Sequence, residues 1–144
     1  MAYSYQGDWE KTGKAMLRDA NVSWKDCNEV CYAIRNKNVD KALKYLDRVL
    51  KKQDFIPYRR YHKKKPHRKG GTPGGWPIKA VKLVKSVLEN AKANAENKGL
   101  DANKLKIVHS TAYKTITLER TKPKGKAIAH NIDLATIEIV VKEV

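Results

Sequence analysis

Residues 105–142 decide the fold, and they read LKIVHSTAYKTITLERTKPKGKAIAHNIDLATIEIVVK. The segments 105–119 and 132–142 are rich in Val, Ile and Thr with a repeat of two, which is typical of β-strands. Turn-forming residues stand midway, at Lys122-Pro123-Lys124-Gly125-Lys126. Folding about this turn pairs residues whose numbers sum to about 248, such as Ile107 with Val141. The sequence predicts one hairpin whose arms of about 12–14 residues extend roughly 40–45 Å, more than twice the usual strand length.

The predicted hairpin changes in character from its base to its tip. Its base is apolar and can pack against helices, through Ile107, Val108, Ile137, Ile139, Val140 and Val141. Its outer part is polar and cationic, with Lys114, Thr115, Thr117, Arg120, Thr121, Lys122, Lys124 and Lys126. If strand alternation continues outward, the cations from Arg120 to Lys126 share one face. Because a lone two-stranded ribbon is marginal in water, we infer that the outer part lies against a phosphate backbone.

Upstream of the hairpin, apolar residues at helical spacing predict three helices. The first covers about 24–35, has Ser23 as its N-cap, and buries Cys27, Val30, Cys31 and Ile34. The second begins near Asn38–Asp40, has Lys51 and Lys52 in its last turn, and buries Ala42, Leu43, Leu46, Val49 and Leu50. The third begins at Pro77 and buries Ile78, Val81, Val84, Leu88, Ala91 and Ala95. Gly99 suits the left-handed position after this helix, so that Leu100 packs back on Ala95 in a Schellman cap.

Charge indicates the class of partner. The chain has 144 residues, which suits one domain, and 31 Lys and Arg against 15 Asp and Glu, for a net charge of +16. Such an excess repels itself unless a polyanion neutralises it, so nucleic acid or an anionic membrane is the expected partner. The membrane is the weaker alternative, because no apolar run approaches the roughly 20 residues of a membrane-spanning helix and no signal-peptide pattern opens the chain. Cys27 and Cys31 are expected as core thiols without a disulfide, which is typical of a reducing, cytosolic compartment.

The segment 53–76, called the basic loop below, shows no apolar periodicity. Its residues 57–70 read PYRRYHKKKPHRKG, with seven Lys or Arg, two His and no acid. A solvated tail or a localisation signal would account for charge alone, but this run lies between two helices that must pack. Rings at Tyr58, Tyr61, His62 and His67 interleave the cations, and rings can stack on unpaired bases while cations hold phosphates. We expect nucleic-acid contacts from Arg59, Arg60, Tyr61, His62, Lys63, Lys64, Lys65, His67, Arg68 and Lys69.

No motif for catalysis is present in the sequence. The four histidines lack zinc-like spacing, no glycine-rich phosphate loop with its Lys-Ser/Thr occurs, and nucleophiles with a nearby base are absent. We therefore expect no enzyme activity, no catalytic residue, no metal and no cofactor. Glu29, Asp47, Glu89 and Glu96 have lysine neighbours, so they are expected to form solvated pairs. Trp24 and Trp76 are expected as core or hinge residues, and residues 13–22 as a short strand.

Motifs along most of residues 11–142 resemble one family. They include KTGKA at 11–15, IPYRRY at 56–61, HRKG at 67–70 and WPIKA at 76–80. The most specific is ANAE at 93–96 with KGLD at 98–101, and the series closes on IVH at 107–109 and IEIVV at 137–141. These motifs resemble large-subunit ribosomal protein twenty-two in its archaeal and eukaryotic version, called seventeen in the older eukaryotic naming. The archaeal-like 57–70 loop favours an archaeal source.

The resemblance implies an α+β fold, in which a small antiparallel sheet packs against three helices and one long β-hairpin protrudes. It further implies a single domain at 13–144, with the basic loop at 53–76, the hairpin at 105–142, and residues 1–12 as an N-terminal extension. A protein of this family is a cytoplasmic, structural constituent of the large ribosomal subunit. It binds large-subunit ribosomal RNA, contacts neighbouring ribosomal proteins, and lines the nascent-peptide exit tunnel with its hairpin. Carried onto this chain, the hairpin contacts would be Lys114, Arg120, Lys122, Lys124, Lys126, His130 and Asn131.

The tip of the hairpin departs from the family pattern. Pro123, Lys124, Gly125 and Lys126 stand in place of an Arg-rich tip about two residues longer. Lysine is a point charge without the planar fork of arginine, so bidentate contacts with phosphates or bases are lost there. A free-standing nucleic-acid-binding protein, of the chromatin or RNA-chaperone type, is the alternative function.

Overall fold

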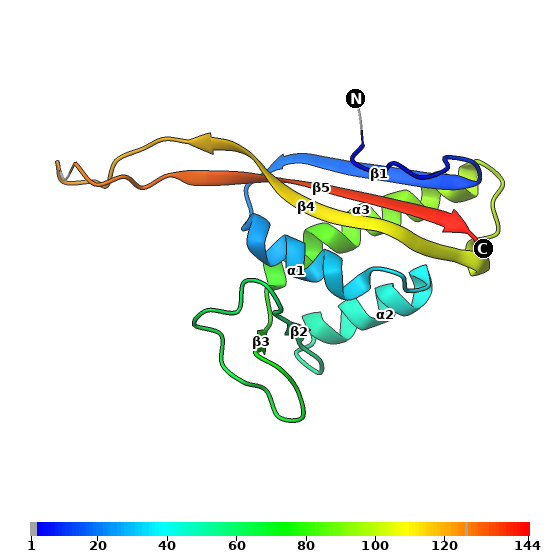
Figure 1. The fold of residues 1–144 in the computed structure, drawn as a ribbon, viewed down its shortest axis with the longest axis horizontal. Coiled ribbons are helices and arrows are strands. Elements are labelled where there is room, and N and C mark those ends of the chain that lie inside the picture. Colours follow the sequence, from blue (N-terminus) through cyan, green and yellow to red (C-terminus); the bar gives the residue numbers. More distant parts are fainter. Residues whose placement is uncertain (1–2, 126) are drawn as a thin grey trace.

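The computed structural model describes residues 3–125 and 127–144. In chain order the elements are β1 (Thr12–Ala20), α1 (Trp24–Ile34), α2 (Val39–Leu50), β2 (Ile56–Pro57), β3 (Gly74–Gly75), α3 (Ile78–Asn97), the 3-10 turn η1 (Ala102–Lys104), β4 (Leu105–Leu118) and β5 (Ile132–Glu143). The main sheet is antiparallel in the order β1-β5-β4, and β2 pairs with β3. The helices gather on one side of this sheet, and the β4-β5 hairpin extends well beyond them (Figure 1). The expected α+β fold is confirmed.

The helix ends follow the capping signals in the sequence. Ser23 Oγ accepts from the Asp26 backbone N–H at 3.3 Å, and Asn38 Oδ1 accepts from the Asp40 N–H at 3.0 Å. After α3, Gly99 has φ 79° and the Leu100 N–H donates to the Ala95 carbonyl at 3.2 Å, which is the predicted Schellman arrangement. Helix α2 ends at Leu50, so Lys51 and Lys52 lie just beyond its last turn.

The core lies between the helices and one face of the sheet. Helix α1 packs chiefly against β4, and α3 packs against β1 and β5. Cys27 and Cys31 are fully buried and free, as expected. Burial raises the pKa of Cys27 to about 12 and that of Cys31 to about 11, so both thiols stay protonated at neutral pH. No helix in the described ranges is both long and apolar enough to cross a bilayer.

Two β-bulges change the register of the hairpin. The predicted sum of 248 is confirmed at its base, where Ile107 pairs with Val141, but the pairs become His109 with Val140 and Thr117 with Asp133 farther out. Each bulge inserts one extra residue into β4 and reverses which side chains face the helices. Leu105 and Ile107 are therefore core residues before the first bulge, whereas Ala112 is a core residue after it.

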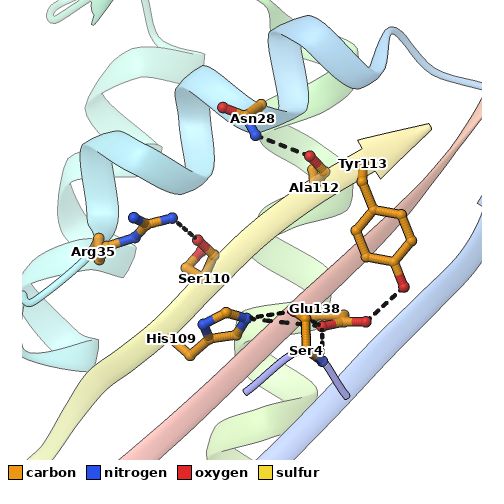
Figure 2. A network of polar contacts seen from close by, with 8 residues as sticks. All are labelled: Ser4, Asn28, Arg35, His109, Ser110, Ala112, Tyr113 and Glu138. Carbon is orange, nitrogen blue, oxygen red and sulfur yellow. Dashed lines mark hydrogen bonds and ion pairs between the residues drawn. The ribbon is translucent and has the colours of Figure 1, made fainter. Parts of the chain in front are cut away.

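The opposite face of the sheet is covered by the N-terminal segment. Ser4 donates to Glu138 Oε2 from its backbone N–H at 2.9 Å and from its hydroxyl at 2.6 Å, and Tyr113 donates to Oε1 at 2.6 Å (Figure 2). Burial opposes ionisation of Glu138, but these hydrogen bonds outweigh it, so the pKa of this carboxyl lies below its ordinary value. Burial also lowers the pKa of the neighbouring His109, against the opposing pull of Glu138. Residues 1–2 of the expected extension lie outside the described residues.

The outer half of the hairpin receives neither kind of cover. Pairing between β1 and β5 ends at Ala135, so beyond this point β4 and β5 form a two-stranded ribbon. Apolar side chains along it remain about half exposed, at 47% for Ile116, 49% for Leu118 and 51% for Ile128. Figure 1 shows this ribbon extending away from every helix. The outer hairpin is therefore a two-stranded ribbon with exposed apolar side chains, an arrangement that is marginally stable by itself in water.

We predict that Gly13→Ala destabilises the fold by about 1–3 kcal/mol, because it overpacks the contact between β1 and α3. A Cβ at this position would lie 2.6 Å from the Ala91 carbonyl oxygen and 2.6 Å from the Ala95 Cβ. The check is the midpoint of urea unfolding. Gly75→Ala is the matched control, since its Cβ would meet only Tyr58 Cε2 at 4.0 Å. Equal losses in the two variants would contradict the packing argument.

Candidate nucleic-acid interface

The basic loop, residues 53–76, is closed at its base by paired backbone. Ile56 pairs with Gly75 and Pro57 with Gly74, and the Tyr58 N–H donates to the Pro73 carbonyl at 2.8 Å. Gly74 makes this pairing possible, because a Cβ there would lie 2.4 Å from the Phe55 ring and 2.8 Å from the Ile56 carbonyl oxygen. The sequence predicted an irregular segment here and missed the β2-β3 ladder. The ladder fixes the two ends of the loop against the helices.

A buried carboxylate holds the start of the basic run. Glu29 in α1 is 2% exposed and accepts three backbone N–H bonds: from Arg59 at 3.1 Å, Arg60 at 2.8 Å and Tyr61 at 2.8 Å. Hydrogen bonds to an ionised acceptor are about twice as strong as neutral ones. The expectation that Glu29 forms a solvated pair with a lysine was therefore wrong. Its charge fixes the backbone at Arg59 and Arg60, whose side chains remain exposed.

Tyr58 anchors the loop from inside and is not available to bases. Its side chain is 2% exposed, and its hydroxyl donates to Asp26 Oδ1 at 2.6 Å. Burial and this hydrogen bond raise the pKa of the Tyr58 phenol far above its ordinary value. The expectation that its ring interleaves the cations as a stacking surface was wrong. Lys65, placed above the ring at 4.4 Å from its centroid, also approaches Asp26, at 3.9 Å.

The remaining rings of the loop lie closer to solvent. Tyr61 is half-buried and packs edge-on against Trp24, with centroids 5.2 Å apart, so Trp24 is packed against the core as expected. His62 and His67 are exposed, as are Lys63, Lys64 and Lys69. The imidazole of His62 lies 3.2 Å from the Arg59 carbonyl oxygen. These side chains are free to meet a ligand on the outer side of the loop.

Trp76 lies at the surface between β3 and α3, so the core alternative of the expectation is wrong. It is 36% exposed, and its indole N–H donates to the Asp54 carbonyl at 2.7 Å. The Arg68 guanidinium lies 4.1 Å from the centroid of this ring and donates to the Gly74 carbonyl at 3.0 Å. These two contacts hold Arg68 in a defined position.

The end of the hairpin carries exposed cations on an irregular backbone. Strand β4 ends at Leu118, and beyond it only Thr121 and Ala129 form a β-bridge among the described residues. Lys124 and Gly125 have φ of 67° and 66°, so strand alternation stops before them and the expected common face does not extend to Lys124. The exposed residues here are Arg120, Lys122, Pro123, Lys124, Gly125, His130 and Asn131. Lys126 lies outside the described residues.

The two cationic segments project from the protein at different places. Figure 1 shows the basic loop below the helices and the hairpin tip far to the side, beyond the sheet. Lys114 belongs to neither end, since it lies along the ribbon and approaches Asp133 at 3.6 Å. The interface predicted from the sequence is therefore not one patch but two projections. Within the described ranges, no three His, Cys, Asp or Glu side chains gather as a metal site would require.

Comparison with known proteins decides the family. The family model for ribosomal protein L22p/L17e matches residues 15–142. This chain belongs to that family. Its relatives include the large ribosomal subunit protein uL22 of Ignicoccus hospitalis, 42% identical over 94% of this chain and 90% of the relative. The same protein of Aeropyrum pernix is 42% identical over 95% and 93%, and that of Methanococcus aeolicus is 38% identical over 98% and 95%.

Membership in the L22p/L17e family agrees with the expectation that the chain is not an enzyme. It also confirms the resemblance carried by the motifs between residues 11 and 142. Two positions that shape the interface were missed at the sequence level, namely Asp26 and Glu29 as anchors of the basic loop. Residues three apart on a helix share a face, so this pair of acids could have been recognised as one acidic face turned to a basic segment.

Replacement of Glu29 by Gln should destabilise the fold by about 1–3 kcal/mol, because one backbone N–H loses its acceptor and faces an amide donor instead. The rate of amide hydrogen exchange at residues 59–61 should also be higher in this variant than in the parent chain. The measurements are urea unfolding and hydrogen exchange. Glu89→Gln is the control, since its side chain is 54% exposed and, among the described residues, pairs with Lys85 alone, at 3.6 Å; its expected loss is about 0.5 kcal/mol or less. If both variants lose the same stability, Glu29 does not hold the loop.

Proposed function

We propose that this chain is a structural component of the large ribosomal subunit, that it binds the RNA of that subunit, and that its hairpin lines the peptide exit tunnel. Membership in the L22p/L17e family and the names of the archaeal relatives support the ribosomal role. Neutralisation of phosphate charge supplies most of the affinity, and the shape of the loop and the hairpin supplies specificity. The nascent chain and neighbouring ribosomal proteins are the further partners.

The observation that carries this proposal is a set of exposed cations that have no acidic partner among the described residues, part of it on a loop whose backbone is fixed. Glu29 and the β2-β3 ladder hold the loop, and within the residues that the structure describes no carboxylate lies within ion-pair distance of these cations: Arg59, Arg60, Lys63, Lys64, Lys69, Arg120, Lys122 and Lys124. A localisation signal or a solvated tail needs no such anchoring. Because the backbone at residues 59–61 is already held, it loses little conformational entropy when the loop meets phosphates.

The shape of the hairpin supports the tunnel role. Its outer ribbon has no third strand, and its half-exposed Ile116, Leu118 and Ile128 interrupt the polar surface. An RNA-walled channel would cover one face of such a ribbon and would leave the other facing the nascent chain. Lys122 and Lys124 would contact phosphates as point charges, without the bidentate geometry of arginine.

We expect the chain to remain with large subunits sedimented through a high-salt cushion, because many phosphate contacts act together with shape. Complete release at moderate salt would contradict a permanent place in the particle. Binding of naked duplex DNA as tightly as large-subunit ribosomal RNA, with equal salt slopes, would instead support a free-standing nucleic-acid-binding protein.

Two sets of charge-removing variants measure the contributions of the basic loop and of the hairpin to RNA binding separately. Replacing Lys63, Lys64 and Lys69 by Gln, or Arg120, Lys122 and Lys124 by Gln, should each lower the slope of log K against log salt by about 2–3, at roughly 0.7–0.9 per lost phosphate contact. The matched control replaces Lys41, Lys44 and Lys82, exposed lysines on α2 and α3, and should change the slope by less. A control effect as large as that of the loop and hairpin variants would mean that charge alone, without a defined interface, drives binding.

A further inference from the structure

We propose that Tyr32, Arg35 and Arg59 form a stacking site for one unpaired nucleotide of RNA, at the C-terminal end of α1. The site rests on the proposed function in that its ligand is RNA, but Tyr32 in α1 and Arg35 just after it lie outside both the basic run and the hairpin. Neither Tyr32 nor Arg35 was among the contacts expected from the sequence.

Tyr32 is an exposed aromatic residue that the core does not use. Its side chain is 45% exposed, whereas Cys27, Val30, Cys31 and Ile34 make the buried face of the same helix. Within the described residues, its hydroxyl has no hydrogen-bond partner in the protein. A large ring at the surface, free of a packing role, is a feature of nucleic-acid and protein binding sites.

Two guanidinium groups lie near this ring, one held by a hydrogen bond and the other on a backbone that is fixed. Arg59 lies 4.6 Å and Arg35 5.5 Å from the ring centroid. Arg35 donates from Nη2 to the Ser110 carbonyl of β4 at 2.7 Å, and Asn28, two turns earlier in α1, donates to the Ala112 carbonyl at 2.9 Å (Figure 2). The backbone of Arg59 is fixed by Glu29 at 3.1 Å. Planar guanidinium groups stack on bases as aromatic rings do, and these two need little reordering to bind.

The three residues form a wall between two hollows. One hollow has a volume of about 520 Å³ and is also lined by Lys37, Tyr45 and Pro57; the other, of about 400 Å³, is also lined by Asn28, Arg60 and Thr111. Both volumes lie in the range of roughly 300–1,000 Å³ that small ligands occupy. A hollow of this size accepts one base with its sugar, but not a paired helix.

Charge identifies the ligand as an anion. The larger hollow is lined by three cations and no acid, and Lys37 is held above the Tyr45 ring at 4.3 Å from its centroid. The smaller hollow contains Glu29, but both oxygens of that carboxylate already accept backbone N–H groups. The site therefore combines planar groups, which can stack on a base, with cations, which can bind its phosphates. A base held in a duplex cannot offer its face to such a wall, so the nucleotide is unpaired.

The site also adjoins the proposed RNA interface. Arg59 and Arg60 belong to the basic loop and line the smaller hollow, so a strand that contacts the loop can continue over α1 without leaving a cationic surface. This continuity favours a nucleotide within a longer RNA over a free mononucleotide. It also favours RNA over an acidic peptide, which would use the cations but not the ring.

The test uses the full-length chain and purified large-subunit ribosomal RNA. Tyr32→Leu removes the ring and keeps an apolar side chain; it should raise Kd by about 5- to 150-fold, the range for loss of one base stack. The slope of log K against log salt should stay unchanged, since no charge is lost. Tyr32→Phe should bind within about twofold of the parent, since the ring is retained. Chemical probing should reveal one unpaired base that the parent and the Phe variant protect and the Leu variant exposes.

Each outcome has a distinct meaning. Equal affinity of the Leu variant and the parent, or equal loss in the Phe and Leu variants, would overturn the stacking site while leaving RNA binding by the loop intact. If polyglutamate protected Tyr32 from nitration and the RNA did not, the site would belong to an acidic protein and the inference would be wrong. Failure of the parent chain to prefer ribosomal RNA over duplex DNA would instead overturn the proposed function. Urea unfolding of each variant controls for loss of fold.

Discussion

Three backbone N–H groups from consecutive residues converge on the buried carboxylate of Glu29, and through them the most cationic segment of the chain becomes part of the fold. The basic loop buries little apolar surface of its own beyond Ile56 and Tyr58, so it depends on this charge-assisted contact and on Asp26 for its position. Helix α1 thus has three tasks: one face builds the core, a second holds the loop, and its C-terminal end presents Tyr32 and Arg35. Loss of the Glu29 carboxylate would therefore disturb two proposed RNA contacts at once, the basic loop and the site at Tyr32.

The sheet has a covered part at the base of the hairpin and an uncovered part beyond it. Helices cover one face and the N-terminal segment covers the other, where Ser4 meets Glu138 (Figure 2). Neither cover extends along the ribbon beyond β1 (Figure 1). The base of the hairpin is therefore buried on both faces, from Ala135 to Val141, while the ribbon beyond it has no cover. A ribbon of this kind gains little stability from its own contacts. This contrast between base and tip is the physical reason to treat the outer hairpin as a binding element.

Local signals in the sequence predicted most of the fold. Apolar stripes and caps such as Ser23 and Gly99 act within a few residues, and they predicted the helices. The alternating segments on either side of the turn at Lys122–Lys126 predicted the hairpin. The β-bulges, the pairing of Ile56 with Gly75 and the exposure of Trp76 depend on tertiary contacts between distant segments, which no local pattern encodes. The spacing of Asp26 and Glu29 does indicate one acidic face, but the burial of Glu29 under the loop depends on such distant contacts. The cations of the candidate interface were visible in the sequence, but their division into two projections and the site at Tyr32 required the structure.

Hydrogen exchange of the same chain, free in solution and within the large subunit, tests the central claim most directly. Amides of residues 59–61 should be protected in both states, because Glu29 accepts them without help from RNA. Amides of residues 114–131 should exchange quickly in the free chain and slowly in the particle, because only a bound surface completes the ribbon. Fast exchange of residues 114–131 in both states, or of residues 59–61 in the free chain, would contradict the account.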